Sequence, residues 1–394
     1  MRRIAANYIF PVTSGPLKNG IVELDEQGTI LAVIDTKGEL SESRNLEFYN
    51  GILVPGFVNS HCHLELSALQ NAFPGQQGLP YFIEQMITYR RKEKISTDVQ
   101  SMKAADQLMF QNGIAAVGDI VNTPRSLDIK RESKIYYHTF VEVSGMGPDV
   151  QERFHAAAKL REKFVQYGLS SSVVPHAPYS VSDRLFEMIK QDAVQHDTIL
   201  SMHNQESREE NKMFVQGEGK LIDTLKAAGI NLSHWQKSGK TSLETILGYL
   251  PPNNHILFVH NLYSTAEEIR QVCKNFSGSF FVLCPLSNVF LENRVPDLSS
   301  FRDCPGKIAL GTDSLASNRT LSVLDEMKIL VRHNPDLAFQ ELLPWASYNG
   351  ARALKIDSRF GSLQKGKSPG LNLITSFDFD KMQITEDSTV KRIV

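Results

Sequence analysis

Two histidines lie one residue apart in the stretch NSHCHLELS, directly after the apolar run GILVPGF. Residues i and i+2 of a β-strand point to the same side, so His61 and His63 would place two imidazoles together. Such a pair is typical of sites for Zn²⁺, Fe²⁺ or Mn²⁺. A His-x-His pair alone is weak evidence, and further ligands elsewhere in the chain are needed to make it a metal site.

Further polar residues share one position, the end of an apolar strand-like run. The carboxyl ends of parallel strands meet on one face of a barrel, so these side chains would converge although some 250 residues separate them. Histidines scattered through a core would not repeatedly take that position. The residues are His61, His63, His176, His203, Glu206, His260 and Asp313.

Each of these residue types has a chemical use at one metal centre. Four ligands would hold a single divalent ion: His61, His63, His203 and Asp313. Water bound to such an ion loses a proton near neutral pH. Glu206, three residues after a ligand, would relay that proton to a leaving group. His260 would orient the water or stabilise developing charge.

The elements that must position these residues follow from Gly51 onward, where eight apolar runs alternate with helix-like segments. The count of eight predicts an α/β protein with a distorted TIM-type (β/α)8 barrel. A doubly wound open sheet is the structural alternative, but no GxGxxG follows the first run. The runs are GILVPGFVNS, IAAVGDIV, IYYHTFVEV, SSSVVPHAPYS, TILSMHNQES, HILFVHN, SFFVLCPLS and KIALGTDS.

The two ends of the chain are β-like in texture. The segment GIVELDEQGTILAVID indicates a hairpin that turns at 26–28. We therefore expect a small β-sandwich domain built from 1–54 and 363–394, and a barrel domain over 55–362. The start of the chain has no long apolar stretch, so it is interpreted as a strand and not as a signal peptide.

Helices are predicted where apolar residues recur at helical spacing, over 96–113 and 150–168. Gly168 would follow the second helix as its C-terminal stop. The stretch from Asn71 to Arg91, rich in Gly, Pro and aromatic residues, is expected to be a loop that covers the pocket.

Composition excludes several classes of function. The 394 residues are 41% hydrophobic and 22% charged, with a net charge of −2. This balance gives no electrostatic reason to expect nucleic acid or a membrane surface as a partner. No apolar run approaches the roughly 18 residues of a membrane span. The four cysteines lie far apart with no CxxC, which predicts neither a disulfide framework nor a structural zinc site and favours a reducing cytoplasm.

Four residues also have a purely structural interpretation. His176 in HAPYS could be a structural histidine in a proline-held loop, and a substrate contact is an equal alternative. Glu65 could cap or pair locally instead of contacting substrate. Asp313 could cap a helix, although Ser314 and Ser317 are available for that. Cys62, between the two histidines, should point away from them into the core.

Several segments together resemble the amidohydrolase superfamily, and most closely its aminohydrolase branch of nucleobase deaminases, nucleoside deaminases and triazine chlorohydrolases. The resemblance covers nearly the whole chain. The closing segment GSLQKGKSPGLNLI departs from it, because the family usually has an Ala-Asp pair near 368–371. The segments that carry the resemblance are GILVPGFVNSHCHLE, MHNQES, FVHN, LCPLSNVFLENRVPD and LGTDSLASNRTLSVLDEM.

The resemblance implies a hydrolase that binds one divalent metal ion, with zinc as the default and Fe²⁺ or Mn²⁺ as alternatives. It implies that Glu206 shuttles protons and that His260 and Asp313 position and deprotonate water. It implies substrate contact for His176. The family's two-metal branch uses a lysine on its fourth strand, and SSSVVPHAPYS has none, which favours a single metal.

The implied reaction is the release of ammonia from an amino-purine nucleoside, an adenosine derivative such as aminodeoxyfutalosine. Alternatives are a guanine- or cytosine-type nucleobase deaminase and a hydrolase that removes chloride or cleaves an amide at a triazine-like ring. A non-catalytic scaffold would have lost ligands, and all four are present. The partner is then a small-molecule substrate, and the resemblance suggests a homodimer.

Overall fold

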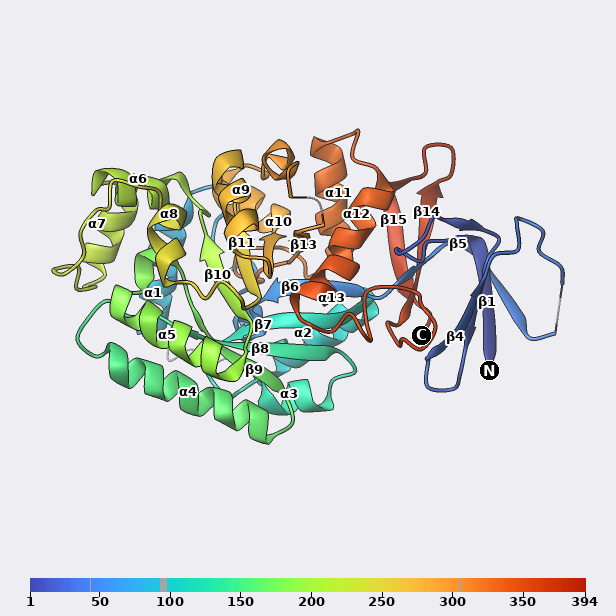
Figure 1. Cartoon of the computed structure of the whole chain (residues 1–394), viewed down its shortest axis with the longest axis horizontal. Helices are drawn as coiled ribbons and strands as arrows, with labels where there is room; N and C mark the ends of the chain where they lie inside the picture. The colour runs from blue at the N-terminus through green and yellow to red at the C-terminus, as the bar shows by residue number, and fades with distance from the viewer. Residues whose placement is uncertain (43, 93–97, 305) are drawn as a thin grey trace.

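Eight parallel strands form two four-stranded sheets at the centre of the molecule (Figure 1). The computed structural model describes residues 1–42, 44–92, 98–304 and 306–394. Nearly every residue of these strands is buried, as parallel strands covered on both faces require. All eight apolar runs contribute a strand, as predicted. The first sheet holds β6 (Phe57–Cys62), β7 (Ile114–Val121), β8 (Tyr136–Val143) and β9 (Ser170–Pro175), and the second holds β10 (Leu200–Asn204), β11 (Ile256–His260), β12 (Ser279–Leu283) and β13 (Ile308–Leu310).

Hydrogen bonds join the two sheets along both pairs of neighbouring edges, one near β9 and β10 and the other near β6 and β13. His203 N donates to His176 O over 3.0 Å between β10 and β9. Thr312 N donates to His61 O over 3.0 Å, and Cys62 and Asp313 form an isolated parallel bridge between β6 and β13. Strand pairing among the described residues therefore gives two sheets and not the single closed barrel that the sequence predicts. At the edge between β13 and β6, β13 has only three residues to pair.

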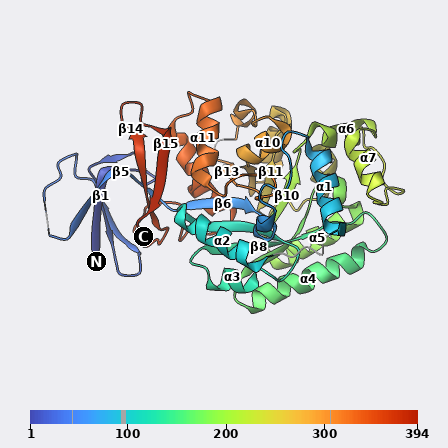
Figure 2. The same cartoon turned by 180° about the vertical axis from the view of Figure 1, so that it is seen from behind.

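Helices surround the parallel strands on their outer side (Figure 2). The two helices that the sequence predicts are present as α2 (Val99–Gln111) and α4 (Val150–Gln166), and Gly168 follows α4 with φ +80°. The other helices of the described chain are α3 (Leu127–Glu132), α5 (Asp183–His196), α6 (Arg208–Gln216), α7 (Lys220–Ala227), α8 (Ser242–Ile246), α9 (Ala266–Asn275), α10 (Pro285–Glu292), α11 (Val323–His333), α12 (Phe339–Ala346) and α13 (Tyr348–Ala353), with short 3-10 turns η1 (Leu64–Leu69), η2 (Pro178–Ser180), η3 (Leu247–Tyr249) and η4 (Leu298–Phe301).

The stretch from Asn71 to Arg91 is not a loop throughout, because α1 spans Leu79–Lys92. Leu79, Phe82 and Met86 recur at intervals of three and four residues, which is helical spacing. The Gly- and Pro-rich start of the stretch hid this pattern. The residues from 93 to 97, which include the start of the helix predicted over 96–113, lie outside the described residues.

The chain ends pair into one seven-stranded sheet at one end of the molecule, where both termini lie (Figure 1). Its order is β15-β14-β5-β1-β3-β4, with β2 on β1. The predicted hairpin is present as β3 and β4, which pair antiparallel. Pairing thus defines one sheet and not the two facing sheets of the expected sandwich. The strands are β1 (Arg2–Ile9), β2 (Leu17–Lys18), β3 (Ile21–Leu24), β4 (Ile30–Ile34), β5 (Leu46–Pro55), β14 (Leu371–Asp378) and β15 (Gln383–Arg392).

Gly56 divides the run GILVPGFVNS between the terminal sheet and the parallel strands. A Cβ atom at this position would lie 2.3 Å from Pro369 O and 2.6 Å from Ala115 Cβ. Only glycine therefore allows the chain to pass between these neighbours. The rigid crossing sets the direction in which β6 leaves toward its two histidines.

The expectation of four unpaired cysteines is wrong for two of them. Cys273 on α9 and Cys304 after η4 form a disulfide, with their Cα atoms 6.4 Å apart. Sequence spacing could not show this, because the packing of α9 on η4 brings the two residues together. Cys62 and Cys284 are free and buried, as expected for Cys62. No helix in the described part of the chain has the length and apolar character needed to cross a membrane.

Candidate metal centre

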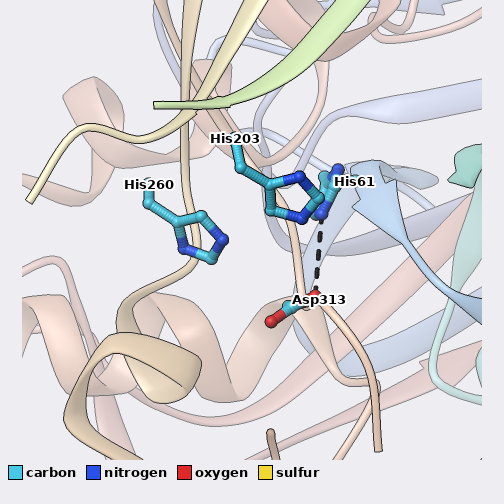
Figure 3. Close-up of side chains that lie close together, drawn as sticks. All are labelled: His61, His203, His260 and Asp313. Atoms are coloured by element: carbon cyan, nitrogen blue, oxygen red, sulfur yellow. Dashed lines mark ion pairs between the residues drawn. The ribbon is translucent and has the colours of Figure 1, made fainter. Parts of the chain in front are cut away.

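Imidazoles and one carboxylate converge at the carboxyl ends of the parallel strands, and Figure 3 shows four of these residues, His61, His203, His260 and Asp313. His61 Nε2 and His63 Nε2 lie 3.1 Å apart, as the i, i+2 spacing predicts, and His63 Nε2 lies 3.3 Å from His203 Nε2. Asp313 Oδ1 lies 3.3 Å from His63 Nε2 and 3.6 Å from His61 Nε2. Ligands about 2.0–2.1 Å from a tetrahedral Zn²⁺ are about 3.3–3.4 Å apart, so the spacing fits one such ion.

A hydrogen bond made by Nδ1 determines which ring nitrogen of His203 carries the hydrogen. Nδ1 lies 2.9 Å from the carbonyl oxygen of His176, which only accepts hydrogen bonds. Nδ1 therefore carries the hydrogen, and Nε2 presents a bare lone pair to the other imidazoles. Lone pairs crowded together in this way repel one another unless a cation lies among them, so the donor set fits a metal ion.

Burial keeps the imidazoles neutral, which is the form that binds a metal. Desolvation lowers the pKa of His61 and His203, and lowers that of His63 to about 3. Burial alone would raise the pKa of Asp313, but the adjacent imidazoles of His61, His63 and His260 hold it well below its usual value. At neutral pH the centre therefore has three neutral imidazoles and one carboxylate.

His260 lies beside this set, and its donor atoms are within 4.8 Å of those of His61, His203 and Asp313. Asn288 Nδ2 donates to His260 Nδ1 over 3.2 Å, which leaves the hydrogen of the imidazole on Nε2. His260 therefore faces the centre with a hydrogen-bond donor, in contrast to His203. Its φ of +74° is unfavourable for a residue with a Cβ atom and sets the direction of the ring.

Glu206 follows β10 and is 4% exposed. Its Oε1 lies 3.5 Å from His260 Nε2. Burial, with smaller contributions from Asp313 and Glu210, raises the pKa of Glu206 well above its usual value. Burial therefore favours the protonated form of Glu206, which is the form that has a proton to give.

Glu210 supports Glu206 from behind and was missed in the sequence. Its carboxylate accepts hydrogen bonds from the backbone N–H groups of Gln205 (3.1 Å) and Glu206 (3.3 Å). Gln205 has a φ of +46°, so these bonds hold a strained turn at the end of β10. The sequence offered only the observation that two more glutamates closely follow Glu206. Glu210 makes this contact and Glu209 does not, so the sequence could not distinguish them.

A buried ion pair that the sequence did not reveal lies beneath the His-x-His pair. Lys130 Nζ lies 2.6 Å from Asp119 Oδ2, and both side chains are fully buried. Asp119 Oδ1 accepts from the backbone N–H of Leu64 over 2.7 Å, directly after His63. The pair thus fixes the turn that presents His63. Asp119 lies within the apolar run IAAVGDIV, which was the available signal, but its partner comes from α3.

A cavity of about 330 Å³ opens above the centre. Its polar floor includes His63, His203, Asp313 and Glu206, and α1 supplies much of an apolar wall. The enclosed volume is at the small end for ligand pockets. The remaining lining residues are Leu66, Leu79, Phe82, Ile83, Met86, Ile87, Asn122, Glu142, Ser144, His176, Tyr179, Ser180, Leu225, Ile230 and Ser314.

The two predicted substrate contacts are placed differently. His176 lines the cavity, and its Nδ1 lies 2.6 Å from Ser180 Oγ, which leaves Nε2 for other partners. Glu65 is not among the residues that line the cavity in the described chain. Its carboxylate accepts from Asn122 N (3.0 Å) and Thr123 Oγ1 (2.6 Å), so it anchors the loop after β7. This placement favours the local role that was weighed for Glu65.

Comparison with known proteins identifies relatives of this chain. It is 26% identical over 336 residues to an adenosine deaminase of Helicobacter pylori, covering 83% of this chain and 79% of the relative. It is 29% identical over 338 residues to an aminodeoxyfutalosine deaminase of Nitratiruptor sp., covering 82% and 79%.

The fold has a counterpart among solved structures. The structure of Helicobacter pylori aminofutalosine deaminase in complex with methylthio-coformycin matches with a TM-score of 0.82 and 22% identity, covering all of both chains. The model of the amidohydrolase family matches residues 52–392. This match spans most of the chain and includes every residue of the centre, and the chain therefore belongs to the amidohydrolase family.

Proposed function

We propose that this protein is a metal-dependent aminohydrolase that replaces the exocyclic amine of an adenosine-type nucleoside by oxygen and releases ammonia. One observation carries the proposal: His61, His63, His203 and Asp313 converge through contacts of 3.1–3.6 Å, and three of them line the floor of a cavity that also holds a buried Glu206. The curated relatives named above are deaminases of this substrate type, which supports the choice of reaction.

The proposed metal is one divalent ion held by these four residues. Imidazole and carboxylate donors at near-tetrahedral spacing favour Zn²⁺, with Fe²⁺ or Mn²⁺ as alternatives. When bound, the ion would supply a water molecule activated for attack on the ring carbon that bears the amine.

The residues of the chain would manage the protons of this reaction. Asp313, held ionised by its neighbours, accepts a proton from the attacking water. Glu206, whose protonated form is favoured by burial, donates its proton to a ring nitrogen as the C–O bond forms. The Nε2–H of His260 stabilises the charge that develops on the oxygen. When the C–N bond breaks, the ionised Glu206 takes the remaining proton from the attached oxygen and passes it to the amine, which leaves as ammonia, and the proton held by Asp313 then restores Glu206.

The finer architecture is also proposed. We infer that residues 55–362 act as a distorted barrel domain, because hydrogen bonds join its two sheets at both ends. Residues 1–54 and 363–394 would form the small β-domain, supported by the pairing of β5 with β14. His176 lines the cavity and would contact the substrate. A homodimer remains a prediction from the family resemblance, and a cytoplasmic location remains a prediction from the spacing of the cysteines.

The test is ammonia release from a panel of adenine nucleosides, amino-purines and chlorinated triazines, measured with metal-loaded and chelator-treated protein. We expect ammonia from an adenine nucleoside, and its loss on chelation. Release of chloride without ammonia would move the assignment to a dechlorinating hydrolase of the same family. Turnover that persists after complete metal removal would refute the proposal.

A further inference from the structure

The two carboxylate oxygens of Asp313 have different surroundings. Oδ1 faces the imidazoles of His61 and His63 at 3.6 and 3.3 Å. Oδ2 accepts hydrogen bonds from the hydroxyl groups of Ser287 (2.7 Å) and Ser317 (2.5 Å). One oxygen is thus directed at the metal centre, while the other is fully engaged by the protein.

The two hydroxyl groups belong to a rigid support. Ser287 and Ser317 are 0% and 1% exposed, and they come from α10 and from the loop after β13. Their neighbours in the sequence share a third partner: Glu326 accepts from Leu286 N (2.8 Å) and from Asn318 Nδ2 (2.9 Å). Glu326 therefore ties together the two segments that deliver the hydroxyl groups.

The backbone of Asp313 needs such support. Its φ is +57°, a left-handed conformation that a residue with a Cβ atom rarely adopts. Asp313 N donates to His61 O over 3.1 Å, which fixes the main chain but leaves the side-chain torsions free. A carboxylate held only by its backbone would rotate and could offer either oxygen, or both, to a cation.

We propose that Ser287 and Ser317 are positioning residues that occupy Oδ2 of Asp313, so that Oδ1 alone faces the three imidazoles. The inference rests on the proposed function, because it concerns how the same metal centre is organised. Hydroxyl donors on the charged carboxylate also stabilise its ionised form, which the ligand role requires. Such supporting contacts typically change metal affinity by about 10–100-fold.

The test compares threonine with valine at each position, because the two side chains have nearly the same shape and only threonine keeps a hydroxyl group. Ser287→Thr, Ser287→Val, Ser317→Thr and Ser317→Val would be stripped of metal and titrated with Co²⁺ against a competing chelator. The visible absorption of bound Co²⁺ reports its coordination directly and does not depend on turnover.

We expect each valine variant to lose about 10–100-fold in Co²⁺ affinity and to show a changed visible spectrum. The threonine variants should stay close to wild type in both. Ser287→Ala and Ser317→Ala remove the hydroxyl without adding volume, so they replace the pair if the larger side chains do not fold. Ser347→Ala is the matched control, since Ser347 is fully buried and its hydroxyl donates to Leu343 O, away from the centre.

The outcomes separate this inference from the proposed function. Valine and alanine variants that keep the wild-type affinity and spectrum would overturn the positioning role alone. Wild-type protein that binds Co²⁺ and responds to the variants, yet releases no ammonia from any nucleoside, would overturn the proposed reaction and leave the positioning role standing. Wild-type protein that binds no Co²⁺ would overturn both.

Discussion

The two sides of the metal centre differ in how their polar atoms are satisfied. On the Asp313 side, carboxylate, hydroxyl and amide groups are joined in hydrogen bonds that extend to Glu326. On the Glu206 side, His260 Nε2 is buried without a hydrogen-bond partner among the described residues. Its nearest carboxylate, Oε1 of Glu206, is 3.5 Å away.

This difference indicates which side positions the proposed ligands and which side receives substrate and water. Buried polar atoms are nearly always hydrogen-bonded, so a buried group left without a partner indicates a place for a ligand or water. The hydroxyl groups that contact Asp313 have their partners without substrate, so this side would keep the proposed ligands in place. The Glu206 side is incomplete, and substrate and water would complete it.

The largest expected effect comes from removing a ligand shared by both sides. His203→Ala should abolish metal binding and ammonia release together, because His203 Nε2 is in contact with the other ligands and its Nδ1 is anchored on His176 O. Metal content per chain, measured by emission spectrometry, checks this. His155→Ala, at an exposed position on α4, is the control and should keep its metal. Full metal content in His203→Ala would remove it from the ligand set.

A variant of Glu206 should lower the rate of ammonia release without changing the amount of bound metal. Glu206→Gln keeps the shape of the side chain but has no acidic proton to give. We expect kcat to fall by about 10²–10⁴-fold, with metal content unchanged. Glu162→Gln, exposed on α4, is the matched control. Normal turnover by Glu206→Gln would end its assignment as the proton shuttle and erase the contrast between the two sides.

The holding side extends to the ion pair beneath His63, and breaking it should cost stability. Lys130→Met leaves Asp119 as a fully buried carboxylate without its cation. Such a change costs about 3–5 kcal/mol of unfolding free energy. The double variant Asp119→Asn/Lys130→Met should recover part of this loss. Chemical denaturation of both proteins measures it, and equal stability of Lys130→Met and wild type would contradict a holding role.

A smaller effect should appear as a pH dependence of stability. Burial raises the pKa of Glu326 to about 8, against a usual value of 4.5. Between these pH values the folded state holds a proton that the unfolded state has released, so stability falls as pH rises. The contribution of Glu326 to the free energy of unfolding is complete below pH 4.5 and lost above about pH 8.

Denaturation of metal-free protein at pH 5.5 and 8.5 would measure this fall. Glu326→Gln cannot titrate, and its loss of stability between the two pH values should be smaller than that of wild type. Glu152→Gln, an exposed change on α4, should behave as wild type. An unchanged difference in Glu326→Gln would place the pH dependence elsewhere.

The sequence predicted the proposed metal ligands better than the residues that support them. His61, His63, His203 and Asp313 end buried strands, and strand ends are recognisable from apolar runs alone. Their convergence followed from the expectation that parallel strands share one face. Their role as ligands remains a prediction, but their meeting point was accessible from spacing.

The supporting residues were not accessible in this way, because their partners are distant in the chain. Lys130 lies on a helix of six residues, and nothing in that helix indicates that its lysine is buried against Asp119. Glu65 is a case in which sequence position left two roles open. Its place two residues after His63 suggested a substrate contact, but its carboxylate is engaged by Asn122 and Thr123.

The closed barrel and the two-sheet sandwich were also not recovered from strand pairing, and both depend on details that composition does not carry. Counting runs predicts how many strands form but not how many residues of each strand pair. β13 pairs over three residues with β12, and the residues that follow it contact β6 through hydrogen bonds to His61 O and the bridge between Cys62 and Asp313.

The terminal sheet has a consequence for how the chain is made. β5 is completed by β14, so residues near position 55 pair with residues near position 371. During synthesis the N-terminal strands leave the ribosome first, and one edge of β5 stays exposed while the whole intervening chain is produced. The protein must keep that edge from pairing with other chains until its own last strands arrive. We expect nascent or C-terminally truncated chains to depend on chaperones more strongly than the finished protein does.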